Sequence, residues 1–314
     1  MRLRIALNAL APLPLDDHLR IGACVPPNGD TDEPSAWVYG VPMTAVLARK
    51  GRVTASLVAA IIAIVAIPAG IAGPVAAAPD SSSSPVEKYV ALGDSVAAGQ
   101  GGGGYVDACL RSPAGYPALL DAEPKLNLLR NAACTGASIA DVTATQLEQV
   151  NRGTTLVTLT VGANNVDLPA IYAACVSGLP TPECVAALVA AETYLLSGQL
   201  QTELGALLAS ISELAPRATI VVTGYPIPFE PGLSEVTDIV NQLVASLNLG
   251  LSSTVDAAAA QGVNVVFAPI DFTGHGFGSV DPWLGVNPND PVTFLHPTPA
   301  GYLVYRAAVL SALS

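Results

Sequence analysis

Short apolar runs rich in β-branched residues recur along the C-terminal three quarters of the chain. Four of them, at residues 89–92, 155–161, 219–223 and 263–267, are too short for ordinary helices and carry few polar positions. Such runs are typical of strands buried on both faces of a parallel sheet. A weaker run at 126–130 completes a predicted set of about five strands.

Alanine- and leucine-rich segments alternate with these runs and predict helices at about 185–214, 235–261 and 299–312. Alternating strands and helices indicate an α/β fold, a three-layer α/β/α sandwich around a central parallel sheet. We find no internal repeat, and we expect a single domain at 88–314 after a serine-rich linker at 79–87. Ligands of such sheets bind beyond the carboxyl ends of the strands.

The segment before this domain has the pattern of a secretory signal peptide at 43–78. A basic stretch at 49–52 precedes an uncharged apolar run, and three alanines stand before Pro79. Met43 would be a natural start for such a leader. Residues 1–42 are therefore interpreted as an upstream extension or a mis-assigned start.

A membrane anchor is the alternative for the same leader, because the uncharged stretch at 53–78 is long enough to cross a bilayer. Pro68 and Pro74, with glycines between them, argue against one straight helix through it. We expect a secreted, extracellular protein, with anchoring by an uncleaved N-terminal helix as the alternative.

Composition narrows the possible partners. The chain is 51% hydrophobic and 12% charged, with a formal net charge of −12. After residue 78 it has 20 acidic and 7 basic residues, a balance that repels phosphate backbones and argues against nucleic-acid binding. Contact with a lipid surface would have to come through apolar side chains near the site. No feature suggests an obligate partner, so we expect a monomer.

Candidate chemistry follows three of the predicted strands. Gly93-Asp94-Ser95 comes directly after the first strand, a segment with Gly136 follows the weak strand, and Asn164 follows the strand at 155–161. A fourth segment begins at His296. A serine hydroxyl needs a neighbouring base to become a nucleophile, and neutral imidazole has the best-matched pKa. When such a serine attacks a carbonyl carbon, the carbonyl oxygen becomes an oxyanion, and N–H donors already directed at that position stabilise it.

These four segments, in this order, resemble the SGNH (GDSL) hydrolase family, and the resemblance covers about residues 89–312. It implies a flavodoxin-like fold, a Ser95 nucleophile and a His296 base, without metal or organic cofactor. It also implies three oxyanion donors: the backbone N–H groups of Ser95 and Gly136 and the side-chain amide of Asn164. Gly136 allows close approach and unusual dihedrals, and an amide donates without carrying a charge.

The chain departs from the family pattern at the acid that orients the base. The family usually has Asp three residues before the histidine, where this chain has Thr293. Some secreted relatives are understood to use a backbone carbonyl there, so we expect the Thr293 carbonyl to accept the Nδ1 proton of His296. Asp290 and Asp281 are alternatives. Asn165 also replaces an acid that is common after the family's asparagine.

The choice of base is narrow because the chain has three histidines. His18 precedes the leader, and His275 lies in a loop that the resemblance places near the mouth of the site. His296 opens a loop that leads into the last predicted helix, as the family's base does.

Four cysteines, Cys109, Cys134, Cys175 and Cys184, follow the leader, and Cys24 precedes it. Four cysteines allow three pairings. Resemblance to secreted lipases implies Cys109–Cys134 and Cys175–Cys184. No Cys-x-x-Cys motif or histidine cluster indicates a metal site.

Two loops near the predicted site have open interpretations. The glycine run at 99–104 matches a dinucleotide-binding spacing. It does not join strand to helix directly, so we interpret it as a flexible loop beside the site. The proline-rich stretch at 225–231 either lines the pocket wall or forms a turn without ligand contact.

The sequence as a whole indicates a secreted serine esterase or lipase that acts on a small-molecule or lipid ester through a Ser-His acyl-enzyme. The alternatives are a carbohydrate O-deacetylase or an acyltransferase on the same fold, or a secreted binding protein without activity.

Overall fold

The computed structural model describes residues 85–175 and 181–314. The leader and residues 1–42 therefore lie outside the described residues. A five-stranded parallel sheet forms the centre of the described part, in the order β2-β1-β3-β4-β5. Its strands are β1 (Glu87–Gly93), β2 (Leu126–Asn131), β3 (Leu156–Thr160), β4 (Thr219–Thr223) and β5 (Val265–Ala268).

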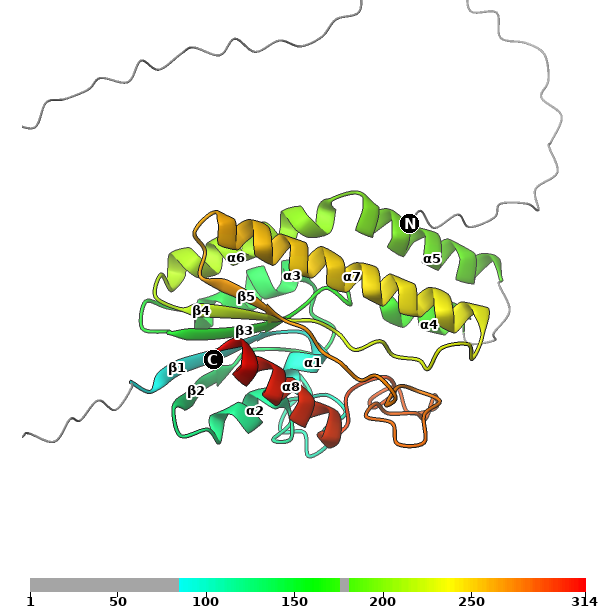
Figure 1. The fold of residues 1–314 in the computed structure, drawn as a ribbon, viewed down its shortest axis with the longest axis horizontal. Helices are drawn as coiled ribbons and strands as arrows, with labels where there is room; N and C mark the ends of the chain where they lie inside the picture. Colours follow the sequence, from blue (N-terminus) through cyan, green and yellow to red (C-terminus); the bar gives the residue numbers. More distant parts are fainter. Residues whose placement is uncertain (1–84, 176–180) are drawn as a thin grey trace, which may run out of the picture. The chain divides into compact units, whose positions relative to one another are not determined.

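Helices cover both faces of this sheet, as the alternating pattern predicts (Figure 1). One face carries α2 (Tyr116–Asp121) and α8 (Pro299–Ala312), which contact each other, with the short α1 (Ser95–Ala98) beside them. The other face carries α6 (Gln199–Leu214) and α7 (Glu235–Ala260), with α5 (Pro182–Leu196) packed against both. The predicted three-layer α/β/α sandwich is therefore confirmed.

The remaining helices are short or lie near the strand ends. They are α3 (Ile139–Asp141), a π-helical turn at Val142–Gln146, a 3₁₀ turn at Leu147–Gln149, and α4 (Leu168–Cys175). Helix α7 has the length and hydropathy of a membrane span. Its apolar face contacts α6 and β5, so in this structure it is a core helix.

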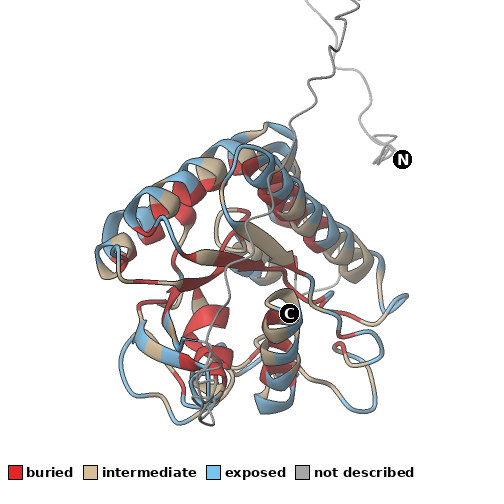
Figure 2. Cartoon of the chain, turned by 60° about the vertical axis from the view of Figure 1, so that its left-hand side comes forward, coloured by how far each residue is buried: buried red, intermediate tan, exposed pale blue. Residues whose placement is uncertain are grey.

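The core lies on both sides of the central strands (Figure 2). Every residue of β3 is buried, and β1 is buried from Tyr89 to Gly93. Burial on both faces explains why these strands are continuous apolar runs. Tyr116 and Tyr305 stack between α2 and α8, with ring centroids 5.5 Å apart.

Strand order sets the place of the site. The chain moves from β1 to the edge strand β2 and then returns across the sheet to β3, so the connections after β1 and β3 leave in opposite directions. A crevice forms at such a reversal, outside the carboxyl ends of the strands. Ser95 follows β1 and Asn164 follows β3, which puts both at this crevice.

The predicted helix at 185–214 is two helices. Helix α5 ends at Leu196 and α6 begins at Gln199, with Gly198 between them at φ +79°. A left-handed residue breaks the helical hydrogen-bond ladder, and glycine adopts it without a Cβ penalty. Hydrophobic periodicity does not register this break, because both helices bury an apolar face on the same core.

We expect Gly198→Ala to lower the free energy of unfolding by about 1–2 kcal/mol, the cost of a left-handed alanine. A Cβ at Gly198 would meet nothing within 4 Å, so steric clash does not contribute. Gly205→Ala, inside α6, is the matched control and should stabilise by up to about 1 kcal/mol. Urea denaturation of both variants tests this, and equal effects at the two positions would contradict it.

Candidate active site

The nucleophile position depends on a turn that has no room for a side chain. Gly93 ends β1 at φ +132°, and a Cβ there would lie 2.0 Å from the carbonyl oxygen of Thr160 in β3. The Asp94 N–H donates to that same carbonyl at 2.9 Å. Asp94 then caps α1 by accepting the Val96 N–H at 3.0 Å. Ser95 is consequently the first residue of α1, at the edge of the cavity described below.

A buried side chain holds Gly93 from the other side. Gln146, in the π-helical turn, accepts the Gly93 N–H at 2.8 Å and donates to the Gly93 carbonyl at 2.9 Å. Strand β2 pairs with β1 only as far as Ala91, so this amide replaces a neighbouring strand at the turn. Nothing in the sequence pattern distinguishes Gln146 from a surface glutamine.

His296 meets Ser95 directly. Its Nε2 lies 2.9 Å from Ser95 Oγ, and its Nδ1 lies 3.0 Å from the carbonyl oxygen of Phe294. A carbonyl can only accept, so the proton of neutral His296 lies on Nδ1 and the unprotonated Nε2 accepts from the serine hydroxyl. This tautomer is the one that a base for Ser95 requires.

The expectation that the Thr293 carbonyl orients the imidazole is wrong. That carbonyl accepts the His296 backbone N–H at 3.0 Å, in a turn where Leu295 has φ +56°. It also packs against the backbone at Gly285, where a Cβ would lie 2.1 Å from it. The turn therefore directs the Thr293 carbonyl into the loop and leaves the Phe294 carbonyl facing the ring.

Neither alternative acid reaches His296. Asp290 accepts from the Thr293 hydroxyl and the Val292 N–H within its own loop. Asp281 lies beside His275, whose Nδ1 donates to the Asp281 carbonyl at 2.7 Å. His275 stacks on Trp283 with ring centroids 3.5 Å apart, and its ring hydrogen bond goes to the Asp281 carbonyl rather than to Ser95.

Burial determines the charge state of the base. Desolvation lowers the pKa of His296 to about 4, and the hydrogen bond to Phe294 opposes this shift without overcoming it. No ionised side chain in the described ranges hydrogen-bonds the ring to stabilise its charged form. His296 is therefore neutral, and able to accept a proton, through mildly acidic and neutral pH.

The three expected oxyanion donors lie around the same space. Gly136 has φ +79° and lines the cavity together with Ser95 and Asn164. The Asn164 amide donates one hydrogen to the Ala137 carbonyl at 3.0 Å, which holds it beside Gly136 and leaves its second N–H free to donate.

The loop that carries Gly136 is fixed at several points. The Cys109–Cys134 disulfide closes it, the Cys134 N–H donates to the Gly93 carbonyl at 3.1 Å, and Arg111 Nε donates to the Ala133 carbonyl at 2.9 Å. The second disulfide joins Cys175 at the end of α4 to Cys184 in α5. Both pairs are those that the resemblance implied.

Asn165, which replaces the family's common acid, has a structural task. Its side-chain oxygen accepts the Ile139 N–H at 3.1 Å, and its amide donates to Glu203 of α6 at 3.1 Å. The loop after β3 is thereby tied to α3 and α6. The donor geometry of Asn164 does not depend on a carboxylate at the next position.

A buried carboxyl lies directly before the serine. Burial raises the pKa of Asp94 to about 7, against a hydrogen bond from Tyr225 and backbone donors that lower it. The Tyr225 hydroxyl donates to Asp94 Oδ2 at 2.5 Å and accepts the Ala163 N–H at 3.2 Å. Tyr225 thus connects the nucleophile turn to the loop that carries Asn164.

A large apolar cavity of about 810 Å³ opens beside these groups. Ser95, Gly136, Asn164 and His296 belong to its polar part, together with Gln100 and Thr135. Aliphatic, aromatic and proline side chains make up most of the rest, among them Leu168, Ile171, Tyr172, Pro226, Pro228, Phe229, Val240, Val244, Phe277 and Phe294. The proline-rich loop at 225–231 is therefore a wall of the pocket.

Among the described residues, no group of three or more His, Cys, Asp or Glu side chains is arranged to hold a metal ion.

Comparison with known proteins identifies the family of the chain. The model of the GDSL-like Lipase/Acylhydrolase family matches residues 91–304. Lipase 1 of Streptomyces coelicolor is 33% identical over 263 residues, which cover 81% of this chain and 95% of the relative. A lipase of Streptomyces rimosus is also 33% identical, over 68% of this chain and 81% of its own length.

Two solved structures have a similar fold at similar identity. The extracellular lipase of Streptomyces rimosus superposes with a TM-score of 0.65 at 32% identity, over 72% of this chain and all of the other. Phospholipase A1 of Streptomyces albidoflavus NA297 also gives 0.65, at 30% identity, over 72% of this chain and 99% of the other.

Proposed function

The chain belongs to the GDSL-like Lipase/Acylhydrolase family of ester hydrolases, and from this premise we propose that it is a secreted serine lipase for esters of long apolar acyl chains. One observation carries the proposal: the Ser95–His296 hydrogen bond of 2.9 Å lies at an apolar cavity of about 810 Å³. That volume is near the upper end for small-molecule pockets. An acetyl group would leave most of it unfilled, and a carbohydrate would bring hydroxyls against aliphatic walls.

The mechanism follows from the proton positions. His296 Nε2 takes the Ser95 proton as Oγ attacks the ester carbonyl carbon, and the carbonyl oxygen becomes an oxyanion. The N–H groups of Ser95, Gly136 and Asn164 stabilise that oxyanion. The imidazolium then returns its proton to the departing alcohol, which leaves an acyl-enzyme. A water molecule activated by His296 repeats the sequence and releases the acid.

Secretion is supported by the two disulfides and by the signal-peptide pattern at 43–78. Disulfides persist in oxidising compartments, and each contributes on the order of 2–4 kcal/mol. The similar lipase of Streptomyces rimosus is described as extracellular.

The first test is hydrolysis of p-nitrophenyl esters from acetate to palmitate by the oxidised protein. We expect kcat/KM to rise with acyl length, because each added methylene is transferred from water into the cavity. Ser95→Ala should lower kcat by about 10⁴-fold or more, and Asn164→Ala by about 10²–10³-fold. A folded Ser95→Ala variant with wild-type activity would refute the mechanism, and a preference for acetate would refute the substrate class.

The acid limb of kcat/KM should lie near pH 4 rather than near 6.5, the ordinary histidine value. The base works when neutral, so activity is lost as pH falls through its folded-state pKa. Hydrolysis of a soluble ester between about pH 3 and pH 8 measures this limb. Asp94→Asn should leave the limb in place, since it belongs to His296. A half-maximum near 6.5 would contradict the buried, neutral base.

We also propose that this enzyme meets its substrate at an uncharged lipid surface. Four aliphatic side chains are exposed on the two loops that line the cavity: Ile227, Leu233, Val280 and Val286. Val280 is fully exposed, and Leu233 packs against Gly278 of the other loop. These residues would enter an ester-lipid interface around the cavity mouth.

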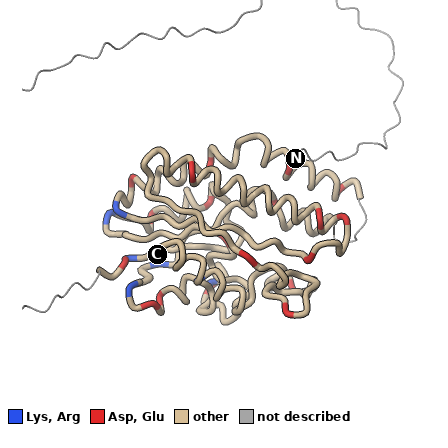
Figure 3. The backbone as a smooth tube through the Cα atoms, in the orientation of Figure 1, with Lys and Arg blue, Asp and Glu red and all other residues tan. Residues whose placement is uncertain are grey.

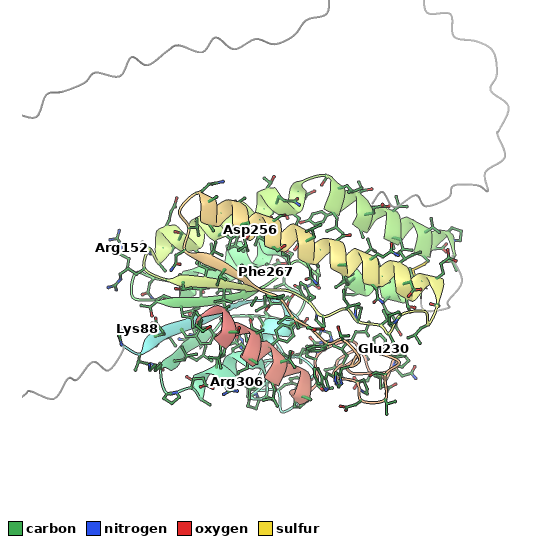
Figure 4. All side chains as sticks on the ribbon, viewed as in Figure 1. Lys88, Arg152, Glu230, Asp256, Phe267 and Arg306 are labelled. Atoms are coloured by element: carbon green, nitrogen blue, oxygen red, sulfur yellow. A yellow bond between two sulfur atoms is a disulfide. The ribbon has the colours of Figure 1, made fainter. Side chains whose placement is uncertain are left out.

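Charge selects the kind of surface. Most basic side chains lie at the end of the domain where the strands begin, whereas acidic side chains are spread over the domain and include those on the loops at the opposite end (Figure 3). Lys88 and Arg152 are far from Glu230, which lies on a cavity loop (Figure 4). The loops at 225–234 and 272–292 have three acids and neither lysine nor arginine. An anionic bilayer would be repelled, so the favoured surface is zwitterionic or neutral.

Val280→Asp should therefore lower the rate on an ester dispersed in phosphatidylcholine vesicles relative to the rate on a soluble ester, because a charge would have to enter the interface. Leu249→Asp, at an exposed leucine of α7, is the matched control and should leave this ratio unchanged. Wild-type protein should also be slower on phosphatidylglycerol vesicles. The proposed lipid-facing surface would be refuted if Val280→Asp and Leu249→Asp had the same ratio of vesicle rate to soluble-ester rate. Faster hydrolysis by the wild type on anionic vesicles would also refute it.

A further inference from the structure

Gln100 is a buried polar side chain beside the candidate site that the mechanism above does not use. It is 5% exposed and lines the cavity together with Ser95 and His296. Its backbone is held on both sides: its N–H donates to the Ser95 carbonyl at 2.9 Å, and its carbonyl accepts from the Tyr302 hydroxyl at 2.6 Å. Its position is thus fixed relative to the nucleophile helix.

The side-chain amide of Gln100 joins two other segments. Its oxygen accepts from the hydroxyl of Thr135, the residue before Gly136, at 2.6 Å. Its nitrogen donates to the carbonyl of Val292 at 2.8 Å and lies 3.5 Å from His296 Nδ1. One neutral group therefore connects the loop of the oxyanion donor to the loop of the base.

The neighbouring glycine allows this contact. Gly101 has φ +93°, and a Cβ there would lie 2.4 Å from the Pro297 carbonyl oxygen and 2.9 Å from His296 Cβ. The backbone after Gln100 therefore packs directly on the base loop. The glycine run at 99–104 provides close approach to His296, rather than the phosphate contact that its spacing suggests.

We propose that Gln100 is a positioning residue for the reaction, which fixes the base loop against the oxyanion loop and so adds restraint to a base whose ring is oriented by a backbone carbonyl rather than by a carboxylate. This inference rests on the proposed Ser95–His296 mechanism. An amide is suited to the task because it donates and accepts at once, and Thr135 needs an acceptor where Val292 needs a donor. Misplacement of a catalytic group by about 1 Å can cost about 10²-fold in rate.

The neutrality of Gln100 has a separate consequence. His296 becomes an imidazolium in the middle of each half-reaction, and Gln100 Nε2 presents hydrogens rather than negative charge to its ring. A carboxylate at this position would attract the charged ring and raise the pKa of His296. Gln100→Glu therefore moves a pH profile that a purely structural side chain would leave in place.

The experiment compares Gln100→Leu, Gln100→Glu and Thr135→Val on one soluble p-nitrophenyl ester, with Gln261→Glu as control. Gln261 is exposed just after α7. Gln261→Glu therefore adds the same negative charge as Gln100→Glu, but at a position away from the site. We expect Gln100→Leu to lower kcat by about 10–10²-fold with little change in KM. Thr135→Val should lower kcat less than Gln100→Leu does. The double variant Gln100→Leu/Thr135→Val should lower kcat by less than the product of the two single effects, because both substitutions remove the same hydrogen bond.

The pH profile supplies the decisive measurement. The acid limb of kcat/KM for Gln100→Glu should move up by at least about one pH unit, while that of Gln261→Glu should match the wild type. A limb unchanged in Gln100→Glu, or kcat within twofold of wild type in folded Gln100→Leu, would overturn the proposal. If Gln100→Leu does not fold, Thr135→Val and the pH profile decide the question.

Results that refute the Ser95–His296 mechanism differ from results that refute only the role of Gln100. A folded Ser95→Ala variant with full activity would refute the proposed function whatever the Gln100 variants do. Loss of activity in Ser95→Ala, combined with unchanged Gln100 variants, would refute only the role of Gln100.

Discussion

The close approach of Gly93 to β3 is the constraint on which the rest of the site depends. A Cβ at this position would lie 2.0 Å from the Thr160 carbonyl, so only glycine lets the chain turn where β1 ends. The turn gives the Asp94 N–H to Thr160, starts α1 at Ser95, and leaves the Gly93 carbonyl free for Cys134 and Gln146. Nucleophile, oxyanion loop and sheet are thereby connected through the backbone of one residue.

Around this turn, polar groups are satisfied mainly by uncharged partners. Asp94 is paired with the Tyr225 hydroxyl, His296 with the Phe294 carbonyl, and Gln100 with Thr135 and Val292. Burial without a charged partner explains why the pKa of Asp94 is raised and that of His296 is lowered. The same burial keeps the imidazole in its neutral form, which can accept a proton, beside an apolar cavity.

Much of the fold and of the candidate site could be predicted from the sequence, since both depend on patterns that repeat or recur in order. Ser95 and Asn164 follow buried strands that are apolar runs, and Gly136 follows the weaker run of β2, so the parallel sheet brings all three to one edge. The predicted orienting carbonyl is the wrong one because carbonyl directions in this turn depend on local dihedrals, such as the positive φ of Leu295, that no sequence pattern marks. Gln100 and Gln146 act through long-range side-chain contacts, and no spacing or period in the sequence marks them.

A base without a carboxylate partner has a physical logic in this environment. A carboxylate next to His296 would stabilise the imidazolium, but it would also have to lose its hydration beside aliphatic and aromatic walls, which is costly for an unpaired charge. A backbone carbonyl has no charge to desolvate and still fixes the tautomer. It is a weaker restraint on the ring than an ionised partner, and the loop must then be held by other means. The short hydrogen bonds of Gln100 and the tight contact at Gly101 restrain the loop that carries the base. An apolar acyl cavity and a carboxylate-free base are thus compatible in one site because neutral contacts restrain the base loop.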